Sequence, residues 1–170
     1  GKDAIANAIK GDFELLDELQ GSDLIGLTFQ APFDDFPANE GVRHIVIPWD
    51  DVSAVEGTGI VHIAPGAGKE DFQLSKVNDL DVIAPLNESG IYMDGFDWLT
   101  GQYVHDVATP IMRDLEKRGF LYRSQQYTHR YPVCWRCGTD LAFRLVDEWF
   151  ISMDQLREPM MNVTRQINWV

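Results

Sequence analysis

The segment GTGIVHIAPGAGKEDF, residues 57–72, joins three local signals that limit how the surrounding chain can fold. Apolar alternation at residues 60–64 predicts a strand that carries His62 on one face. The glycines and proline of residues 65–68 predict a tight turn, because glycine tolerates backbone angles that other residues avoid. An acidic pair ending in Asp71 then opens a helical run, where unsatisfied N–H groups favour negative charge. The segment therefore predicts a strand, a turn and a helix in immediate succession.

The rest of the chain predicts a mixture of strands and helices. β-branched or alternating runs predict short strands, and apolar spacing of three and four residues predicts helices. Gly119 is expected to end one helix and Pro159 to interrupt another. Because the elements do not alternate strictly, we expect an α+β fold around a barrel-like mixed β-sheet, decorated with helices. The expected strands are 25–29, 43–49, 51–56, 60–64 and 81–86, and the expected helices are 2–12, 70–80, 103–120 and 153–167.

The charge of the chain argues against independent nucleic-acid binding. The 170 residues carry 14 basic and 27 acidic side chains, a net charge of −13, which repels a polyanion at long range. Residues 113–144 differ, with seven Lys or Arg against three acids, or +4 locally. If any part of the chain contacts phosphate, we expect it to be this stretch. For any single residue in it, a solvated mixed surface is the simpler interpretation.

Composition also bears on compartment. The sequence has no apolar run of about 20 residues, so we expect no membrane span. The N-terminal residues lack the hydrophobic stretch of a signal peptide. Two cysteines in the spacing C-x-x-C do not make a disulfide framework, and a reducing environment fits them better. We therefore expect a cytoplasmic protein.

Cys134 and Cys137 in CWRCGT place two thiols on one tight knuckle, which suits zinc. A closed structural zinc site takes four ligands, so two more are needed. His105 and His129 are candidates by residue type. Two buried free thiols are an interpretation of comparable weight for this sequence.

The glycine turn suggests a small ligand pocket. Backbone N–H groups at Gly66, Ala67 and Gly68 can face a ligand oxygen, and the Asp71 carboxylate can hold an ammonium group. A free or esterified amino acid presents both groups. The structural alternative is a satisfied strand histidine at His62 and a helix-capping role for Asp71.

The segment closely resembles the signature of the editing domain of isoleucyl-tRNA synthetase, G-T-G-[hydrophobic]-V-H-x-A-P-x-x-G-x-x-D-[aromatic]. HRYPVCWRCGTDLAFR followed by EWFISM is similar to the stretch that leads back to the catalytic core of that class I enzyme. ELQGSDLIGLTFQAPF resembles the strands that precede the signature. The valyl and leucyl enzymes share the insertion but lack this H-x-A-P context. The resemblance implies that residues 1–125 are the C-terminal portion of the editing domain and residues 126–170 a return segment with the cysteine knuckle.

The resemblance implies hydrolytic editing of Val-tRNA(Ile). A hydrophobic pocket discriminates poorly against one missing methylene, which costs about 1–3 kcal/mol, and isoleucine against valine is the standard instance. Asp71 matches the aspartate that grips the substrate's α-ammonium, and His62 matches the signature histidine of the pocket. No protein nucleophile is needed if the ribose hydroxyl and backbone groups position the water. Ala67 stands where many family members carry a second histidine, which leaves pocket size and proton handling open.

The resemblance also implies partners and absences. The aminoacyl 3′ end of tRNA and the remainder of the synthetase chain are the expected partners of a monomeric protein. The sequence contains no HIGH or KMSKS element and no T-T-R-P-W-T-like run, so the aminoacylation core is not expected in it. No cofactor is expected in these residues, although a second C-x-x-C in the full-length enzyme would complete a zinc site. A non-catalytic zinc-knuckle module that positions tRNA, and a structural insertion without activity, remain the alternatives.

Overall fold

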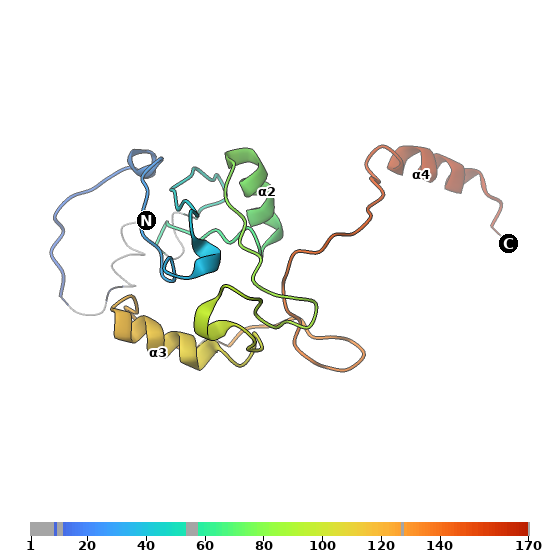
Figure 1. Ribbon diagram of the computed structural model, residues 1–170. Helices are drawn as coiled ribbons and strands as arrows, with labels where there is room; N and C mark the ends of the chain where they lie inside the picture. The colour runs from blue at the N-terminus through green and yellow to red at the C-terminus, as the bar shows by residue number, and fades with distance from the viewer. Residues whose placement is uncertain (1–8, 10–11, 54–57, 127, 170) are drawn as a thin grey trace.

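The computed structural model describes residues 9, 12–53, 58–126 and 128–169 (Figure 1). The helix expected at 2–12 lies largely outside the described residues, the strand expected at 51–56 lies partly outside them, and Gly57 at the start of the signature lies outside them. Three α-helices and three short 3-10 helices are present in the described residues. The α-helices are α2 (Lys69–Asn78), α3 (Ala108–Arg118) and α4 (Arg157–Gln166), and the 3-10 helices are η1 (Gly21–Leu24), η2 (Pro37–Asn39) and η3 (Asp97–Leu99).

The expected barrel-like mixed β-sheet is wrong. The described residues contain only isolated antiparallel bridges, such as Thr28 with Ile45 and Leu86 with Tyr92, and no sheet. Residues 60–64 form no bridge with any other described residue, and the Ile60 side chain is 68% exposed. Apolar alternation describes the two faces of a strand, but a sheet forms only when other strands supply its hydrogen bonds and cover one face. The predicted α+β fold class is therefore wrong, because the described residues form helices but no β-sheet.

Two of the expected strands do meet, over a single bridge. Next to the Thr28–Ile45 bridge, Gly26 N–H donates to Val46 O at 2.9 Å and Val46 N–H donates to Leu27 O at 2.9 Å. Strand propensity thus identified two segments that lie side by side, but they pair over too few residues to form a β-ladder.

The helix expectations fare better. The helix expected at 70–80 is α2, and the helix expected at 103–120 is the shorter α3. Gly119 ends α3 in a left-handed conformation, φ +78°, while Phe120 N–H donates to Leu115 O at 2.9 Å. The predicted interruption at Pro159 is wrong. Pro159 lies in the first turn of α4, where the missing N–H breaks no helical hydrogen bond.

A small hydrophobic core lies where η2, η3 and the start of α3 meet. Phe36, Phe96, Leu99 and Val107 are buried together. Partly buried neighbours complete the cluster, namely Phe33, Ile83, Tyr92, Trp98 and Ile111. Because these residues come from four separate segments, the core depends on loops that return to the same place.

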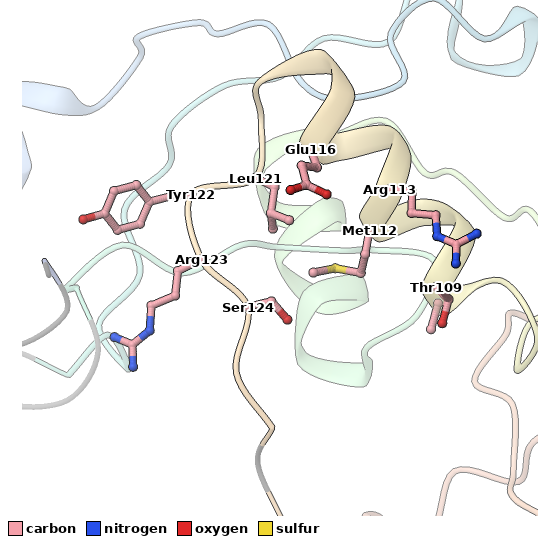
Figure 2. A pocket seen from close by; sticks show the side chains of 9 residues that line it. Thr109, Met112, Arg113, Glu116, Leu121, Tyr122, Arg123 and Ser124 are labelled. Atoms are coloured by element: carbon pink, nitrogen blue, oxygen red, sulfur yellow. The ribbon is translucent and has the colours of Figure 1, made fainter.

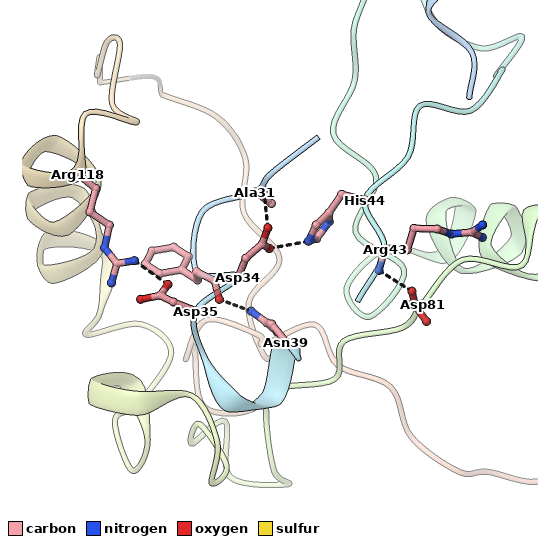
Figure 3. A network of polar contacts seen from close by, with 9 residues as sticks. Ala31, Asp34, Asp35, Asn39, Arg43, His44, Asp81 and Arg118 are labelled. Carbon is pink, nitrogen blue, oxygen red and sulfur yellow. Dashed lines mark hydrogen bonds and ion pairs between the residues drawn. The ribbon is translucent and has the colours of Figure 1, made fainter. Parts of the chain in front are cut away.

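Polar contacts hold the loop of residues 31–44 against the rest of the core (Figure 3). The Asp34 carboxylate accepts the Ala31 N–H at 2.8 Å and contacts His44 Nε2 at 2.7 Å. From α3, Arg118 reaches Asp35 at 2.7 Å, and its guanidinium lies 5.5 Å from the Phe33 ring centroid. These contacts join the loop to a helix about 80 residues later in the chain.

Residues 145–169, called the arm below, lead away from the region of the hydrophobic core and include α4. Figure 1 shows α4 at the end of the arm, away from α2 and α3. Trp149 and Phe150 on the arm are 103% and 81% exposed. Among the helices described, none is long and apolar enough to cross a membrane.

Candidate functional site at the glycine turn and the cysteine knuckle

The glycine turn is formed by hydrogen bonds back to Ala64. Ala67 N–H donates to Ala64 O at 2.9 Å, and Gly68 N–H donates to the same oxygen at 3.2 Å. Gly68 then precedes α2 in an extended conformation, φ −116° and ψ 144°. The turn and the helix start follow each other as the sequence predicts, whereas the preceding strand is extended chain without a sheet.

Gly66 is buried, and its role in the described structure is close backbone packing. A β-carbon at this position would lie 1.8 Å from the carbonyl oxygen of Ile83. Residue 66 must therefore be glycine for the turn to lie against residues 83–84. In the described structure, Gly66 makes this close approach to another part of the chain.

Asp71 folds back over the turn. Its Oδ2 accepts the Ala64 N–H at 3.0 Å, and a β-carbon on Gly68 would lie 2.6 Å from that same oxygen. Gly68 thus makes room for the carboxylate. An ionised carboxylate has about four acceptor positions, so one N–H donor leaves capacity for an ammonium group.

The remaining predicted site residues lie near this turn without forming a closed pocket. His62 is exposed, and no hydrogen bond or ion pair joins it to Asp71 among the residues described. Ala67 is exposed as well. The fold therefore brings Gly66, Gly68 and Asp71 into one compact turn, with His62 on the extended chain that enters it.

The two cysteines lie on a tight hairpin turn. Gly138 N–H donates to Cys134 O at 2.8 Å, and Cys134 N–H donates to Thr139 O at 2.8 Å. The Cys137 sulfur lies 2.9 Å from the Thr139 hydroxyl. Hydrogen bonds to the hydroxyl and backbone of Thr139, and then to Cys134, lower the pKa of the Cys137 thiol to about 7. A more readily ionised thiol suits a metal ligand.

Among the described residues, no further pair of zinc ligands lies at the knuckle. The rings of His105 and His129 both contact Tyr131, at centroid distances of 6.3 and 6.1 Å. Within the described ranges, no three His, Cys, Asp or Glu side chains gather closely enough to hold a metal ion. Two thiols fit half of a tetrahedral zinc site, so no step is assigned to a metal here.

A groove that the sequence did not reveal lies between α3 and residues 121–124 (Figure 2). It has a volume of about 570 Å³ and is open to solvent. Met112 and Leu121 form its apolar part, while Arg113 and Arg123 point outward on opposite sides. The reversal after Gly119 creates the groove by turning the chain back along the helix. Its only sequence signal was that glycine at a helix end.

Comparison with known proteins shows that the chain is similar to one segment of several longer proteins. No model of a known protein family matches it. The isoleucine–tRNA ligase of Methanothermobacter thermautotrophicus is 35% identical over 170 residues, 99% of this chain and 16% of that protein. The ligase of Methanothrix thermoacetophila is 38% identical over 173 residues, covering 98% of this chain and 16% of the relative. That of Natranaerobius thermophilus is 35% identical over 160 residues, or 94% of this chain and 17% of the relative.

The chain spans about 16% of the length of the first two of these relatives. The three matches nevertheless cover 94–99% of this chain. The chain matches isoleucine–tRNA ligases along nearly its whole length and covers one segment of them, which confirms the resemblance indicated by the glycine-turn signature.

Proposed function

We propose that this chain is the part of an isoleucine–tRNA ligase that hydrolyses Val-tRNA(Ile), with the aminoacylation core outside these residues. The observation that carries the proposal is the Asp71 carboxylate, held across the glycine turn by the Ala64 N–H at 3.0 Å. A carboxylate fixed in this way can orient an α-ammonium group through a charge-assisted hydrogen bond. The similarity to isoleucine–tRNA ligases supports tRNA as the partner.

The proposed reaction is hydrolysis of the ester between valine and the terminal ribose of tRNA. Water attacks the ester carbonyl, the bond from that carbon to the ribose oxygen breaks, and the ribose oxygen takes up a proton. Free valine and uncharged tRNA are released. Asp71 holds the substrate's ammonium, while His62, Ala67 and Gly68 border the ester and Gly66 lets the turn pack against residues 83–84. No side chain of this set acts as a nucleophile, because the ribose hydroxyl and backbone groups position the water.

Asp71→Asn, introduced in the ligase that contains this segment, tests the proposal. Asparagine keeps an oxygen that can accept the Ala64 N–H but loses the negative charge, so the turn should persist while ammonium binding fails. We expect Val-tRNA(Ile) deacylation to fall at least about 100-fold, the scale of a misplaced substrate. The measurement is release of labelled valine from pre-charged tRNA.

Glu70→Gln is the matched control, because Glu70 is an exposed acid in the same first turn of α2. It should deacylate at the original rate. Gly68→Ala tests the geometry, since its β-carbon would push on the Asp71 oxygen 2.6 Å away, and it should give an intermediate loss. Unchanged deacylation in Asp71→Asn, or an equal loss in Glu70→Gln, would refute the role of Asp71.

The alternative is that the cysteine knuckle positions tRNA without catalysis. It predicts that the original protein and every variant bind tRNA normally and that none of them hydrolyses Val-tRNA(Ile).

The zinc proposal concerns the whole ligase, which we take to be cytoplasmic and monomeric. Cys134 and Cys137 would coordinate zinc together with two ligands from elsewhere in that longer protein. Metal analysis of that longer protein before and after Cys137→Ser tests the zinc proposal, and equal zinc content in both would contradict it.

A further inference from the structure

The cysteine hairpin carries a group of aromatic rings that the chemistry proposed at the glycine turn does not use. Tyr131 lies at its centre, with His105, His129 and Phe143 packed edge to face around it at 6.1–6.5 Å. The Tyr131 hydroxyl donates to Leu141 O across the hairpin at 2.8 Å. Tyr131 and Phe143 remain 42% and 57% exposed, so the rings are held in place yet accessible.

Trp135 projects from the turn between the two cysteines. Its side chain is 87% exposed, and the guanidinium carbon of Arg136 lies 4.9 Å from its ring centroid. The hydrogen bonds of Cys134 and Gly138 fix the turn beneath it. A large ring is therefore presented to solvent on a hydrogen-bonded support, with a cation against it.

The charge around these rings selects the kind of partner. Residues 121–144 hold four arginines and one aspartate, +3 in a chain whose net charge is −13. The arm offers a contrast, since residues 145–156 expose Trp149 and Phe150 but carry three acids and no lysine or arginine. Aromatic rings beside arginines suit unpaired nucleotides, whose bases stack on the rings while their phosphates pair with the cations. Rings among acids do not suit a polyanion.

We propose that Tyr131, Trp135, Arg136 and Phe143, the knuckle face, bind unpaired nucleotides of an RNA strand. One base stacks on Trp135, and Arg136 contacts the adjoining phosphate. The proposal rests on the proposed function only in taking tRNA as the natural source of the strand, and it requires no hydrolysis. It adds a second contact with tRNA, separate from the glycine turn.

The test measures binding of a labelled single-stranded RNA oligonucleotide and a blunt RNA duplex of equal length to the 170-residue chain. We expect the single strand to bind more tightly than the duplex. Trp135→Ala should weaken single-strand binding roughly tenfold, within the range for loss of one base stack, while Trp135→Phe should retain most of it. Trp149→Ala, the matched control on the arm, should bind like the original chain.

A second readout examines the phosphate contact. Arg136→Gln should reduce the slope of log affinity against log salt by about 0.7, the value for one contact to single-stranded nucleic acid. Circular dichroism of each variant checks that it is folded. If Trp135→Ala does not fold, the comparison of single strand with duplex and the salt slope of Arg136→Gln still decide the question.

Several results would overturn the proposal. They are no detectable RNA binding, equal affinity for strand and duplex, unchanged affinity in Trp135→Ala, an equal loss in Trp149→Ala, or an unchanged salt slope in Arg136→Gln. The RNA-binding assay measures binding alone, so the two proposals can fail separately. If RNA binding depends on Trp135 but Val-tRNA(Ile) is not deacylated, the proposed function is refuted and this inference stands. If Val-tRNA(Ile) is deacylated but RNA binding does not depend on Trp135, only this inference is refuted.

Discussion

The core region, residues 33–118, and the arm, residues 145–169, use the same kinds of side chain in opposite surroundings. Phe36 in the core region is 2% exposed, whereas Phe150 on the arm is 81% exposed. Phe36 packs with Phe96, Leu99 and Val107 from other segments, whereas Phe150 lies in a part of the arm that forms no helix or strand. Residue type therefore does not decide which phenylalanine is buried. A side chain is buried here when segments that are distant in the chain pack around it.

The polar contacts of the two regions differ in the same way. Arg118 reaches Asp35, 83 residues away, with side-chain exposures of 27% and 61%. On the arm, Arg157 pairs with Asp154 three residues away at 3.6 Å, with exposures of 70% and 90%. Of these two pairs, the one on the arm joins neighbouring residues at the start of α4, whereas Arg118 and Asp35 join segments that are far apart in the chain. Exposed pairs such as the one on the arm contribute little.

Truncation of one phenylalanine in each region should show the largest difference. Phe36→Ala removes a buried ring from a small core and should lower the free energy of unfolding by about 3–5 kcal/mol. Phe150→Ala should leave it unchanged, because the ring is already in water. Urea unfolding followed by circular dichroism measures both.

A loss that large is a considerable fraction of the stability of an ordinary domain. If Phe36→Ala does not fold, Phe36→Leu should show a smaller, measurable decrease. Equal stability of Phe36→Ala and Phe150→Ala would break the comparison between the two regions.

Glycine substitutions should give the next largest effect. Gly66→Ala would place a β-carbon 1.8 Å from Ile83 O, so the turn must separate from residues 83–84. We expect a loss of about 1–3 kcal/mol, as for an overpacked core. Gly21→Ala is the control, since nothing lies within 4 Å of its added carbon. A thermal unfolding series that showed no difference between the two variants would contradict the close packing at residue 66.

The smallest effect concerns pH. The hydrogen bond from Arg118 lowers the pKa of Asp35 in the folded chain, so the stability it adds is present above the unfolded carboxyl pKa of about 3.9. That stability is lost as pH falls through the lowered pKa. Asp35→Asn should therefore have a slightly lower Tm than the original chain at neutral pH, with the difference vanishing in acid.

Asp154→Asn, from the exposed arm pair, should match the original chain at every pH. Melting curves collected from acid to neutral pH compare the three proteins. A Tm difference for Asp35→Asn that persisted or grew below the lowered pKa would show that the ion pair is not its cause.

What the sequence determined by itself was local. The start of α2 after Gly68, the end of α3 at Gly119 and the turn at Cys134–Cys137 follow from residues within a few positions of each other. The signature of residues 57–72 also indicated the ligase resemblance that the comparisons confirmed. Neighbouring residues suffice for these features, because turns and helix ends are closed by short-range hydrogen bonds.

Tertiary structure alone decided the rest. Alternation at residues 60–64 predicted a sheet strand, but no partner strand lies beside it in the described chain, so no sheet forms. Gly66 packs against the backbone of Ile83, and the His105 ring contacts Tyr131. Such contacts join residues that are far apart in the chain. Their formation depends on how the loops return, which no short stretch of sequence encodes.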